Sequence, residues 1–233
     1  WERAVAAAQV VALRAAGQPV TIEGGGLRVS SVAARSPWRE QLAPGDVIVE
    51  VNGARVWFLE QAAERLRAQA DGQLTVRRGS ELLRLPYERQ HLDPKVRDNR
   101  RLLVGVSLEN ADWSLNTPVQ VEVIAPTVRG PSAGLALALE IYRRVQALDL
   151  PAGMILAATG TLSLEGRVGA VGALEPKLAA ARAAGVTTVI VPAANPLTRS
   201  GGRDHLEILA VQTFAEAVQT LFGPGRAAGA GRE

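Results

Sequence analysis

The sequence predicts an α/β (α+β) fold with two domains, a small mixed β domain followed by a larger α/β domain. Short alternating strands separated by glycine turns occupy the first part of the chain, whereas strands alternate with helices in the second. The segment 89–101 is polar, densely charged and contains a proline, so we place a solvated linker and the domain boundary there. The domains then span 1–90 and 91–223, and a flexible glycine-rich tail follows at 224–233.

The elements of the first domain follow from hydrophobic periodicity and turn residues. An alanine-rich helix ends before Gly17 and Pro19, and Asn52-Gly53 closes a central strand. A Ser-Pro turn with a short helix lies at 35–42. The other expected elements are a helix at 2–15, strands at 19–22, 27–34 and 47–53, a helix at 58–70 and a hairpin at 73–88.

The second domain alternates between strands and helices. Glycines punctuate a strand pair, and a continuous apolar run predicts a buried strand. The expected strands are 102–108, 119–126, the pair within 153–171, 186–195 and 206–214, and the expected helices begin near 130, 175 and 215.

Composition excludes several kinds of chemistry. The chain has 233 residues, 47% of them hydrophobic, which is enough for a core, and it has no cysteine, which excludes disulfides, thiol nucleophiles and thiolate metal sites. The net charge is +3, but acids and bases are interspersed, so we expect no nucleic-acid partner. No apolar run is long enough for a membrane-spanning helix. Lysine occurs only at Lys95 and Lys177, and histidine only at His91 and His205.

The segment Leu42–Gly53 reads L-x-x-G-D-x-I-x-x-V-N-G. With the strand before it and the helix after it, this signature resembles a bacterial PDZ domain over residues 1–88. The resemblance implies a peptide-binding groove between the strand 19–22 and the helix 58–70. The loop that captures the peptide carboxylate would lie near 16–20, and a second candidate for it is 24–27. The alternative is that these glycines only make turns. The expected peptide-binding residues are Gly17, Gln18, Pro19 and Val20.

The stretch VRGPSAGLALALEIYRRV (128–145) places one hydroxyl at the start of an amphipathic helix. A serine there either caps the helix or acts as a nucleophile. Flanking glycines would let a substrate backbone approach, and the N–H groups of the helix start would suit an oxyanion. Ser132 is therefore a candidate nucleophile. The candidate contacts for the oxyanion and the substrate backbone are Gly130, Pro131, Ala133 and Gly134.

A nucleophilic serine needs a base, and Lys177 is the candidate. Pro176 favours the first helical position, which puts Lys177 in the first turn. The positive end of a helix disfavours a cation, as do the apolar residues that follow, and a general base must be neutral. The alternative is an exposed lysine with no chemical role. We interpret His205 as a structural or surface histidine.

Together these segments resemble Lon-type serine proteases over residues 102–222. GPSAGLALAL is similar to the nucleophile segment of that family, and 159–195 to its lysine segment. The resemblance implies a dyad of Ser132 as nucleophile and Lys177 as general base, with Thr159 orienting the lysine. It implies an endopeptidase that works through an acyl-enzyme with no cofactor or metal. Because the chain has no G-x-x-x-x-G-K-[ST] loop, we expect it to be ATP-independent.

Two residues depart from the family pattern. Arg129 stands where an acidic residue is common, and Gly172-Ala173 replaces a Gly-Gly pair. These departures leave open a second hypothesis, a non-catalytic adaptor in which a degenerate protease fold serves as a scaffold.

The order of the two domains resembles bacterial PDZ–Lon proteases. That resemblance implies a peptide or protein substrate selected by the PDZ domain. It also implies a membrane anchor that precedes Trp1, with both domains outside the cytoplasm, so that membrane contact would come only through a segment absent from this chain. The oligomeric state is left open, and a homo-oligomer is one alternative.

Overall fold

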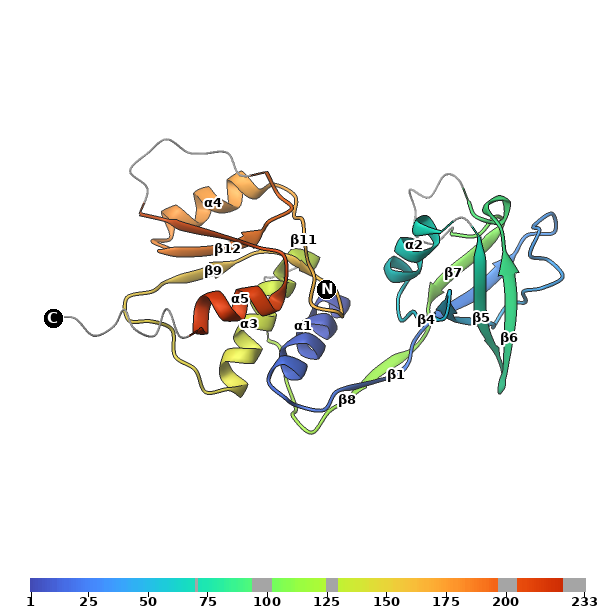
Figure 1. Ribbon diagram of the computed structural model, residues 1–233, viewed down its shortest axis with the longest axis horizontal. Coiled ribbons are helices and arrows are strands. Elements are labelled where there is room, and N and C mark those ends of the chain that lie inside the picture. Colours follow the sequence, from blue (N-terminus) through green and yellow to red (C-terminus); the bar gives the residue numbers. More distant parts are fainter. Residues whose placement is uncertain (70, 94–101, 125–129, 197–204, 224–233) are drawn as a thin grey trace. The chain divides into compact units, whose positions relative to one another are not determined.

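The computed structural model describes residues 1–69, 71–93, 102–124, 130–196 and 205–223 (Figure 1). The chain divides into two compact units, one made of Trp1–Thr21 with Thr117–Glu233 and the other of Ile22–Asn116. We call them the split unit and the inserted unit, because the second interrupts the first along the chain. Both contain helices and strands, which confirms the α/β class.

The units differ from the expected domains 1–90 and 91–223 for two reasons. Helix α1 (Glu2–Ala15) packs against α3 (Gly134–Val145), so it joins the C-terminal half of the chain. Strand β7 (Val106–Asn110) pairs with β2 (Leu27–Val32) and so completes the sheet of the inserted unit. In both cases the hydrophobic partner lies far away in the sequence. The buried face of α1 consists of Ala4, Ala6, Ala7, Ala8, Val10, Val11, Ala12 and Leu13.

The inserted unit is built on an antiparallel sheet with the order β6-β5-β3-β2-β7. Helix α2 packs against β3 and β7. Strands β1 and β8, where the chain enters and leaves the unit, pair with each other. Among the described strands, β6 and β7 are therefore the two edges of the larger sheet. The remaining elements are β1 (Thr21–Gly24), β3 (Val47–Val51), β4 (Ala54–Arg55), α2 (Leu59–Ala68), β5 (Gly72–Arg78), β6 (Glu81–Tyr87), η1 (Arg89–His91) and β8 (Trp113–Asn116).

Trp38 anchors the core of the inserted unit. It is fully buried, and its indole Nε1 donates to the carbonyl oxygen of His91 at 3.0 Å. The segment 35–42, where we expected a short helix, forms turns instead. In that segment the Ser36 hydroxyl donates to the carbonyl oxygen of Val104 at 2.7 Å. These long-range hydrogen bonds explain why turns replace the helix.

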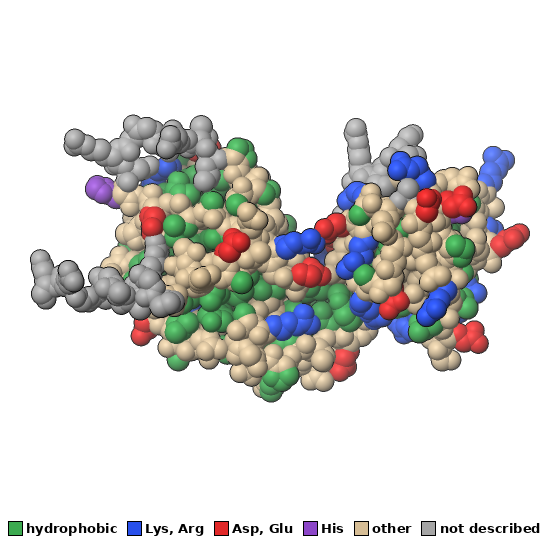
Figure 2. All heavy atoms as spheres, viewed as in Figure 1, with side chains coloured by type: hydrophobic (Ala, Val, Ile, Leu, Met, Phe, Trp, Pro, Cys, Tyr) green, Lys and Arg blue, Asp and Glu red, His purple; other side chains and the backbone are tan. Residues whose placement is uncertain are grey.

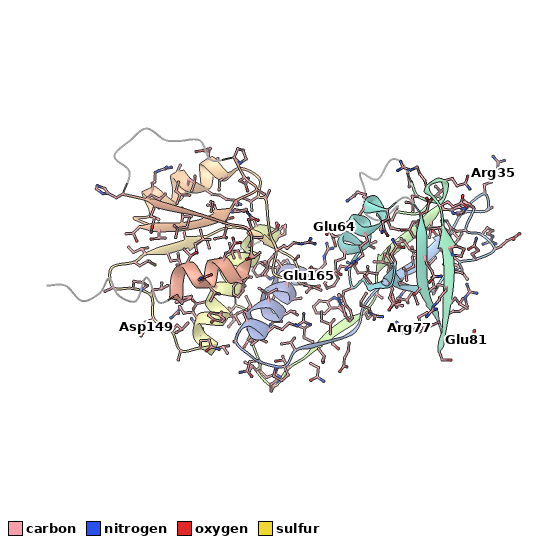
Figure 3. The ribbon with its side chains drawn as sticks, in the orientation of Figure 1. Arg35, Glu64, Arg77, Glu81, Asp149 and Glu165 are labelled. Carbon is pink, nitrogen blue, oxygen red and sulfur yellow. The ribbon has the colours of Figure 1, made fainter. Side chains whose placement is uncertain are left out.

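A buried carboxylate joins the turn before β3 to the hairpin of β5 and β6. The Asp46 side chain is only 2% exposed and accepts hydrogen bonds from Arg78 at 2.7 and 2.8 Å and from the N–H of Ala43 at 2.8 Å. Burial alone would raise the pKa of Asp46, but the hydrogen bonds from Arg78 and Ala43 outweigh it and lower that pKa. Figure 3 labels Arg77 and Glu81 at the end of this hairpin.

The split unit has a parallel sheet with the order β13-β12-β9. The middle strand β12 is buried at every position, as expected where helices cover both faces. Figure 1 shows α4 on one side of this sheet and α3 with α5 on the other. An antiparallel pair, β10 with β11, follows β9. The bounds are η2 (Pro131–Ala133), β9 (Leu156–Ala158), β10 (Thr161–Leu162), β11 (Val168–Gly169), α4 (Leu174–Ala183), β12 (Thr188–Pro192), β13 (Glu207–Val211) and α5 (Phe214–Phe222).

One expected strand is not formed. Of the segment 119–126, residues 119–124 are described and none belongs to a strand, and Ile124 is 80% exposed. The carbonyl oxygen of Val121 accepts a side-chain hydrogen bond from Gln9 of α1 at 2.9 Å. Residues 125 and 126 lie outside the described part. Alternating valines favour a strand but do not make one without a partner strand.

The described helices include none that is both long and apolar enough to cross a membrane. On the face shown in Figure 2, acidic and basic side chains lie interspersed.

Candidate active site

Ser132 lies in the middle of the turn η2, which runs directly into α3. Gly130 precedes the turn with φ +90°, a conformation that favours glycine, and Pro131 follows at the first helical position. The N-cap positions of η2 and α3 are Gly130 and Ala133, and neither element has a side-chain cap. Ser132 therefore occupies no capping position, so a capping role does not explain its hydroxyl.

The backbone of Ser132 is bonded to the segment that follows β9. Its carbonyl oxygen accepts from the N–H of Gly160 at 2.8 Å and from the Thr159 hydroxyl at 3.3 Å. The N–H of Leu135 donates to the carbonyl oxygen of Gly160 at 3.1 Å. A Cβ on Gly160 would lie 2.8 Å from Val168 and 3.2 Å from Leu135, so this close approach requires glycine. The start of α3 and the end of β9 are thus held together.

Helix α4 brings Lys177 to the same place. The helix begins at Leu174, so Pro176 is its third residue rather than the first, and Lys177 is the fourth. The Nζ atom of Lys177 donates to the hydroxyl oxygen of Thr159 at 3.2 Å. Thr159 is 8% exposed, and its hydroxyl in turn donates to the Ser132 carbonyl oxygen. Three candidate residues of the sequence therefore meet, joined through one threonine hydroxyl.

This arrangement supplies the groups that acyl transfer needs. A lysine amine can take a proton from a serine hydroxyl, and a threonine hydroxyl can hold that amine in place. The start of a helix presents N–H groups and partial positive charge to an oxyanion. In the comparison with known families, residues 114–222 match the model of the Lon protease (S16) C-terminal proteolytic domain.

Residues 114–222 thus form a Lon-type proteolytic domain.

The matched region runs from β8 to the end of α5 and includes Ser132, Thr159 and Lys177. Helix α1 packs in the same unit but precedes the matched region, and the inserted unit separates the two along the chain.

Lon proteases of distant organisms are similar to this region. The chain is 32% identical over 119 residues to Lon protease 2 of Bacillus subtilis (strain 168), covering 51% of this chain and 20% of that protein. It is 38% identical over 97 residues to the mitochondrial Lon protease homolog of Phaeodactylum tricornutum, covering 40% of this chain and 11% of that protein. It is 35% identical over 105 residues to the archaeal Lon protease of Methanocaldococcus jannaschii, covering 45% of this chain and 16% of that protein. The chain thus spans at most a fifth of the length of these relatives.

For the inserted unit, the likeness to a solved structure is slight. The PDZ domain of the SdrC-like protein from Listeria monocytogenes matches 38% of this chain and 92% of that chain, with 18% identity and a TM-score of 0.31. This score is too low to support an argument, so the role of the inserted unit has to come from its own geometry.

The expected carboxylate loop belongs to the split unit. Gly17, with φ +76°, and Gln18 donate their N–H groups to carbonyl oxygens in the last turn of α1, and so end that helix. Pro19 has no N–H, and Val20 is buried. Their donors serve the helix end, so the structure does not gather these four residues into an anion-binding nest.

The second candidate loop, 24–27, is likewise occupied. The N–H of Gly25 donates to the carbonyl oxygen of Asp112 at 2.8 Å, and that of Gly26 to Trp57 at 3.1 Å. A Cβ on Gly24 would lie 2.5 Å from the Asp112 oxygen. These glycines therefore serve the close packing of neighbouring segments, which agrees with the alternative that they have a conformational role only.

The glycines around Ser132 have different tasks. The N–H of Gly134 donates to the carbonyl oxygen of Pro131, and a Cβ on Gly134 would lie 3.2 Å from Leu162. Gly134 thus lets α3 pack against β10 of the Lon domain. A Cβ on Gly130 would meet no atom within 4 Å, so that residue is needed for its positive φ. Of the expected oxyanion contacts, Ala133 is left at the helix start as the candidate N–H donor.

Ala173, the departure from a Gly-Gly pair, is the N-cap residue of α4 and has a left-handed backbone with φ +52°. This conformation costs an L-residue about 1–2 kcal/mol, which explains why glycine suits the position. Arg129 lies outside the described residues. His205 is exposed, whereas His91 accepts a hydrogen bond from the N–H of Glu88 at Nδ1, which is a structural role.

The sequence analysis assigned no role to Asn195, which is the last residue of the lysine segment 159–195. In the structure its amide binds both backbone groups of Val171, shortly before α4. Its place at the end of that segment, three residues after Pro192, was a signal that could have directed attention to it.

Proposed function

We propose that the Lon domain is a serine endopeptidase in which Ser132 is the nucleophile and Lys177 the general base. The observation that carries the proposal is the contact of Lys177 Nζ with Thr159, whose hydroxyl binds the backbone of Ser132. The relatives are Lon proteases, which supports a peptide or protein substrate. No step proposed here requires a nucleotide or a metal.

In this mechanism, the Ser132 hydroxyl oxygen attacks the scissile carbonyl carbon while the Lys177 amine takes its proton. The oxyanion that forms is bound by N–H groups at the start of the η2–α3 helix, with Ala133 the proposed donor. The C–N bond then breaks, and Lys177 returns the proton to the leaving amine. Water, deprotonated by Lys177, hydrolyses the resulting ester and frees Ser132.

The test uses Ser132→Ala and Lys177→Arg, because arginine keeps the positive charge but cannot act as a base. We expect both variants to fold and to lose at least about a thousandfold in peptide cleavage. A matched control is Ser163→Ala, whose hydroxyl oxygen accepts from the N–H of Arg167 at 3.1 Å. Cleavage by Lys177→Arg at nearly the wild-type rate would refute the dyad.

The adaptor hypothesis is the second candidate, and the strained backbone at Ala173 favours it. A fluorophosphonate separates the two hypotheses, because only an activated serine reacts with it. Peptide mapping by mass spectrometry should find the label on Ser132 in the wild type and lose it in Lys177→Arg. A folded wild-type chain that binds peptide but leaves Ser132 unlabelled would favour the adaptor.

For the inserted unit, we propose that an extended peptide segment adds to the edge strand β7, beside α2. Among the described strands β7 pairs only with β2, and α2 packs against it. The side-chain oxygen of Asn110 accepts from the N–H of Leu59 at 2.9 Å, which ties the end of β7 to the start of α2. Addition of a strand at such an edge is a common mode of peptide recognition. This proposal replaces the groove expected beside residues 19–22.

Hydrogen exchange tests this placement. In the uncleaving Ser132→Ala chain, saturating peptide should slow exchange of the β7 amides at 106–110. The other edge strand, β6, is the internal control and should be unaffected. Protection of β6 alone, or of neither edge, would contradict the placement.

A further inference from the structure

We infer that Asn195 is a positioning residue for Lys177, an inference that rests on the proposed peptidase function. The Asn195 Nδ2 donates to the carbonyl oxygen of Val171 at 2.8 Å, and its Oδ1 accepts from the N–H of Val171 at 2.9 Å. One side chain thus makes both hydrogen bonds that a neighbouring strand would make. Asn195 holds the backbone immediately before the helix that carries the base.

The connection from Val171 to the helix that carries Lys177 is short. Val171 is buried in a cluster with Leu174 and Leu178 of α4. Only Gly172 and the left-handed Ala173 separate it from the first helical residue. A shift of the Val171 backbone therefore moves the start of α4, and with it a lysine in the first turn.

Strand β12 is the common support of both partners. The N–H of Thr159 donates to the carbonyl oxygen of Ile190 at 3.0 Å, which fixes the threonine to the middle of β12. Asn195 lies just past the end of the same strand, and its N–H donates to Pro192 at 3.1 Å. Thr159 is thus held by β12 directly, and Lys177 through Asn195. The contact of Nζ with the threonine hydroxyl depends on both links.

Asn195 acts through Val171, so it should affect the chemical step more than substrate binding. Displacement of a catalytic group by about 1 Å can cost on the order of a hundredfold in rate. Asn195→Ala removes both hydrogen bonds to Val171. Asn195→Asp keeps the size and one acceptor, but it sets a carboxylate oxygen against the Val171 carbonyl oxygen, where the amide donated.

Thr187 supplies the matched control. Its hydroxyl accepts from the N–H of Ile155 at 2.9 Å and donates to the Ile155 carbonyl oxygen at 3.4 Å. It therefore makes the same pair of bonds to one backbone residue, but at the opposite ends of β9 and β12. Thr187→Val removes these bonds without touching the support of Lys177.

The experiment measures kcat and KM for a peptide, and the rate at which a fluorophosphonate labels Ser132 from about pH 5 to 9. Each variant is studied at a temperature below the midpoint of its thermal unfolding. We expect both Asn195 variants to lose at least about tenfold in kcat and in labelling rate, with KM within about threefold and a changed pH profile. Thr187→Val should label at the wild-type rate.

Asn195 variants that label like Thr187→Val would overturn the inference, as would a failure of both to fold while Thr187→Val folds, because either outcome makes the residue purely structural. A wild-type chain that neither cleaves nor labels would instead refute the proposed function itself.

Discussion

The amine nitrogen of Lys177 lies 3.2 Å from the hydroxyl oxygen of Thr159, although the two residues come from different elements. Thr159 follows the strand β9, and Lys177 lies in the first turn of α4. The same hydroxyl donates to the Ser132 carbonyl oxygen, so it has a donor on one side and an acceptor on the other. Removal of this one oxygen therefore separates the lysine from the serine backbone without altering either residue.

Thr159→Val should lower kcat by about ten- to a hundredfold, because valine keeps the shape but removes the hydroxyl oxygen that accepts from the lysine amine. Thr159→Ser, which keeps the hydroxyl, should retain most of the activity. Peptide hydrolysis with circular dichroism as a folding check measures both. Equal activity of the two variants would mean that the hydroxyl does not orient the base.

Ala173→Gly should stabilise the split unit by about 0.5–1 kcal/mol, because glycine relieves the left-handed strain at φ +52° and only part of the gain is lost to unfolded-chain entropy. The control is Ala179→Gly, at an exposed interior position of the same helix, which should destabilise by about 1 kcal/mol. Urea unfolding compares them. If Ala173→Gly destabilised the unit as much as Ala179→Gly does, the assignment of strain to residue 173 would be contradicted.

Arg78→Met should destabilise the inserted unit at neutral pH, because it leaves the buried Asp46 carboxylate without its cation. The pKa of Asp46 is lowered in the folded protein, so its contribution is complete above the unfolded value of about 4 and disappears as pH falls through the folded value. The free energy of unfolding, measured at a series of acid pH values, should therefore depend less on pH in the variant than in the wild type.

Arg28→Met is the control for that experiment. Its partner Asp112 is 96% exposed although the pair is only 2.6 Å apart, so the free energy of unfolding should hardly change. A loss as large as that of Arg78→Met would show that burial of the carboxylate is not the cause.

Gly160→Ala should lower stability by about 1–3 kcal/mol and reduce cleavage, because the new methyl would lie 2.8 Å from Val168 at the junction that holds Ser132. Val168→Ala in the same chain makes room for that methyl. The double variant should therefore lose less than the sum of the single changes, which a double-mutant cycle in urea measures. Strict additivity would argue against this contact.

The class of fold could be predicted because it rests on local signals, whereas the meeting of Ser132, Thr159 and Lys177 was implied by the resemblance to Lon-type proteases. Gly-Pro before a serine and a proline near a lysine both mark helix starts, and motif spacing links the two segments. The helix start near Lys177 was misplaced by two residues, because a left-handed alanine is not recognisable from a single chain.

What the sequence could not show is decided by partners far apart along the chain. The alanines of α1 read as part of the first domain, yet they pack on α3. Gly17 looked like part of a binding loop, but it ends α1. The valines at 119–123 alternate like a strand and still find no partner strand within the described residues. Asn195 acquires its significance only when Val171 is seen beside it.

The position of α1 has a consequence for the order of folding during synthesis. The helix is made before the inserted unit and α3 after it, so at about 5–20 residues per second its apolar face waits on the order of ten seconds for its partner. The inserted unit, which is one continuous stretch of chain, can complete its own core in that interval. The inserted unit can thus fold during synthesis before α3 is available to pack against α1. Until then, α1 is the segment that a chaperone would have to protect.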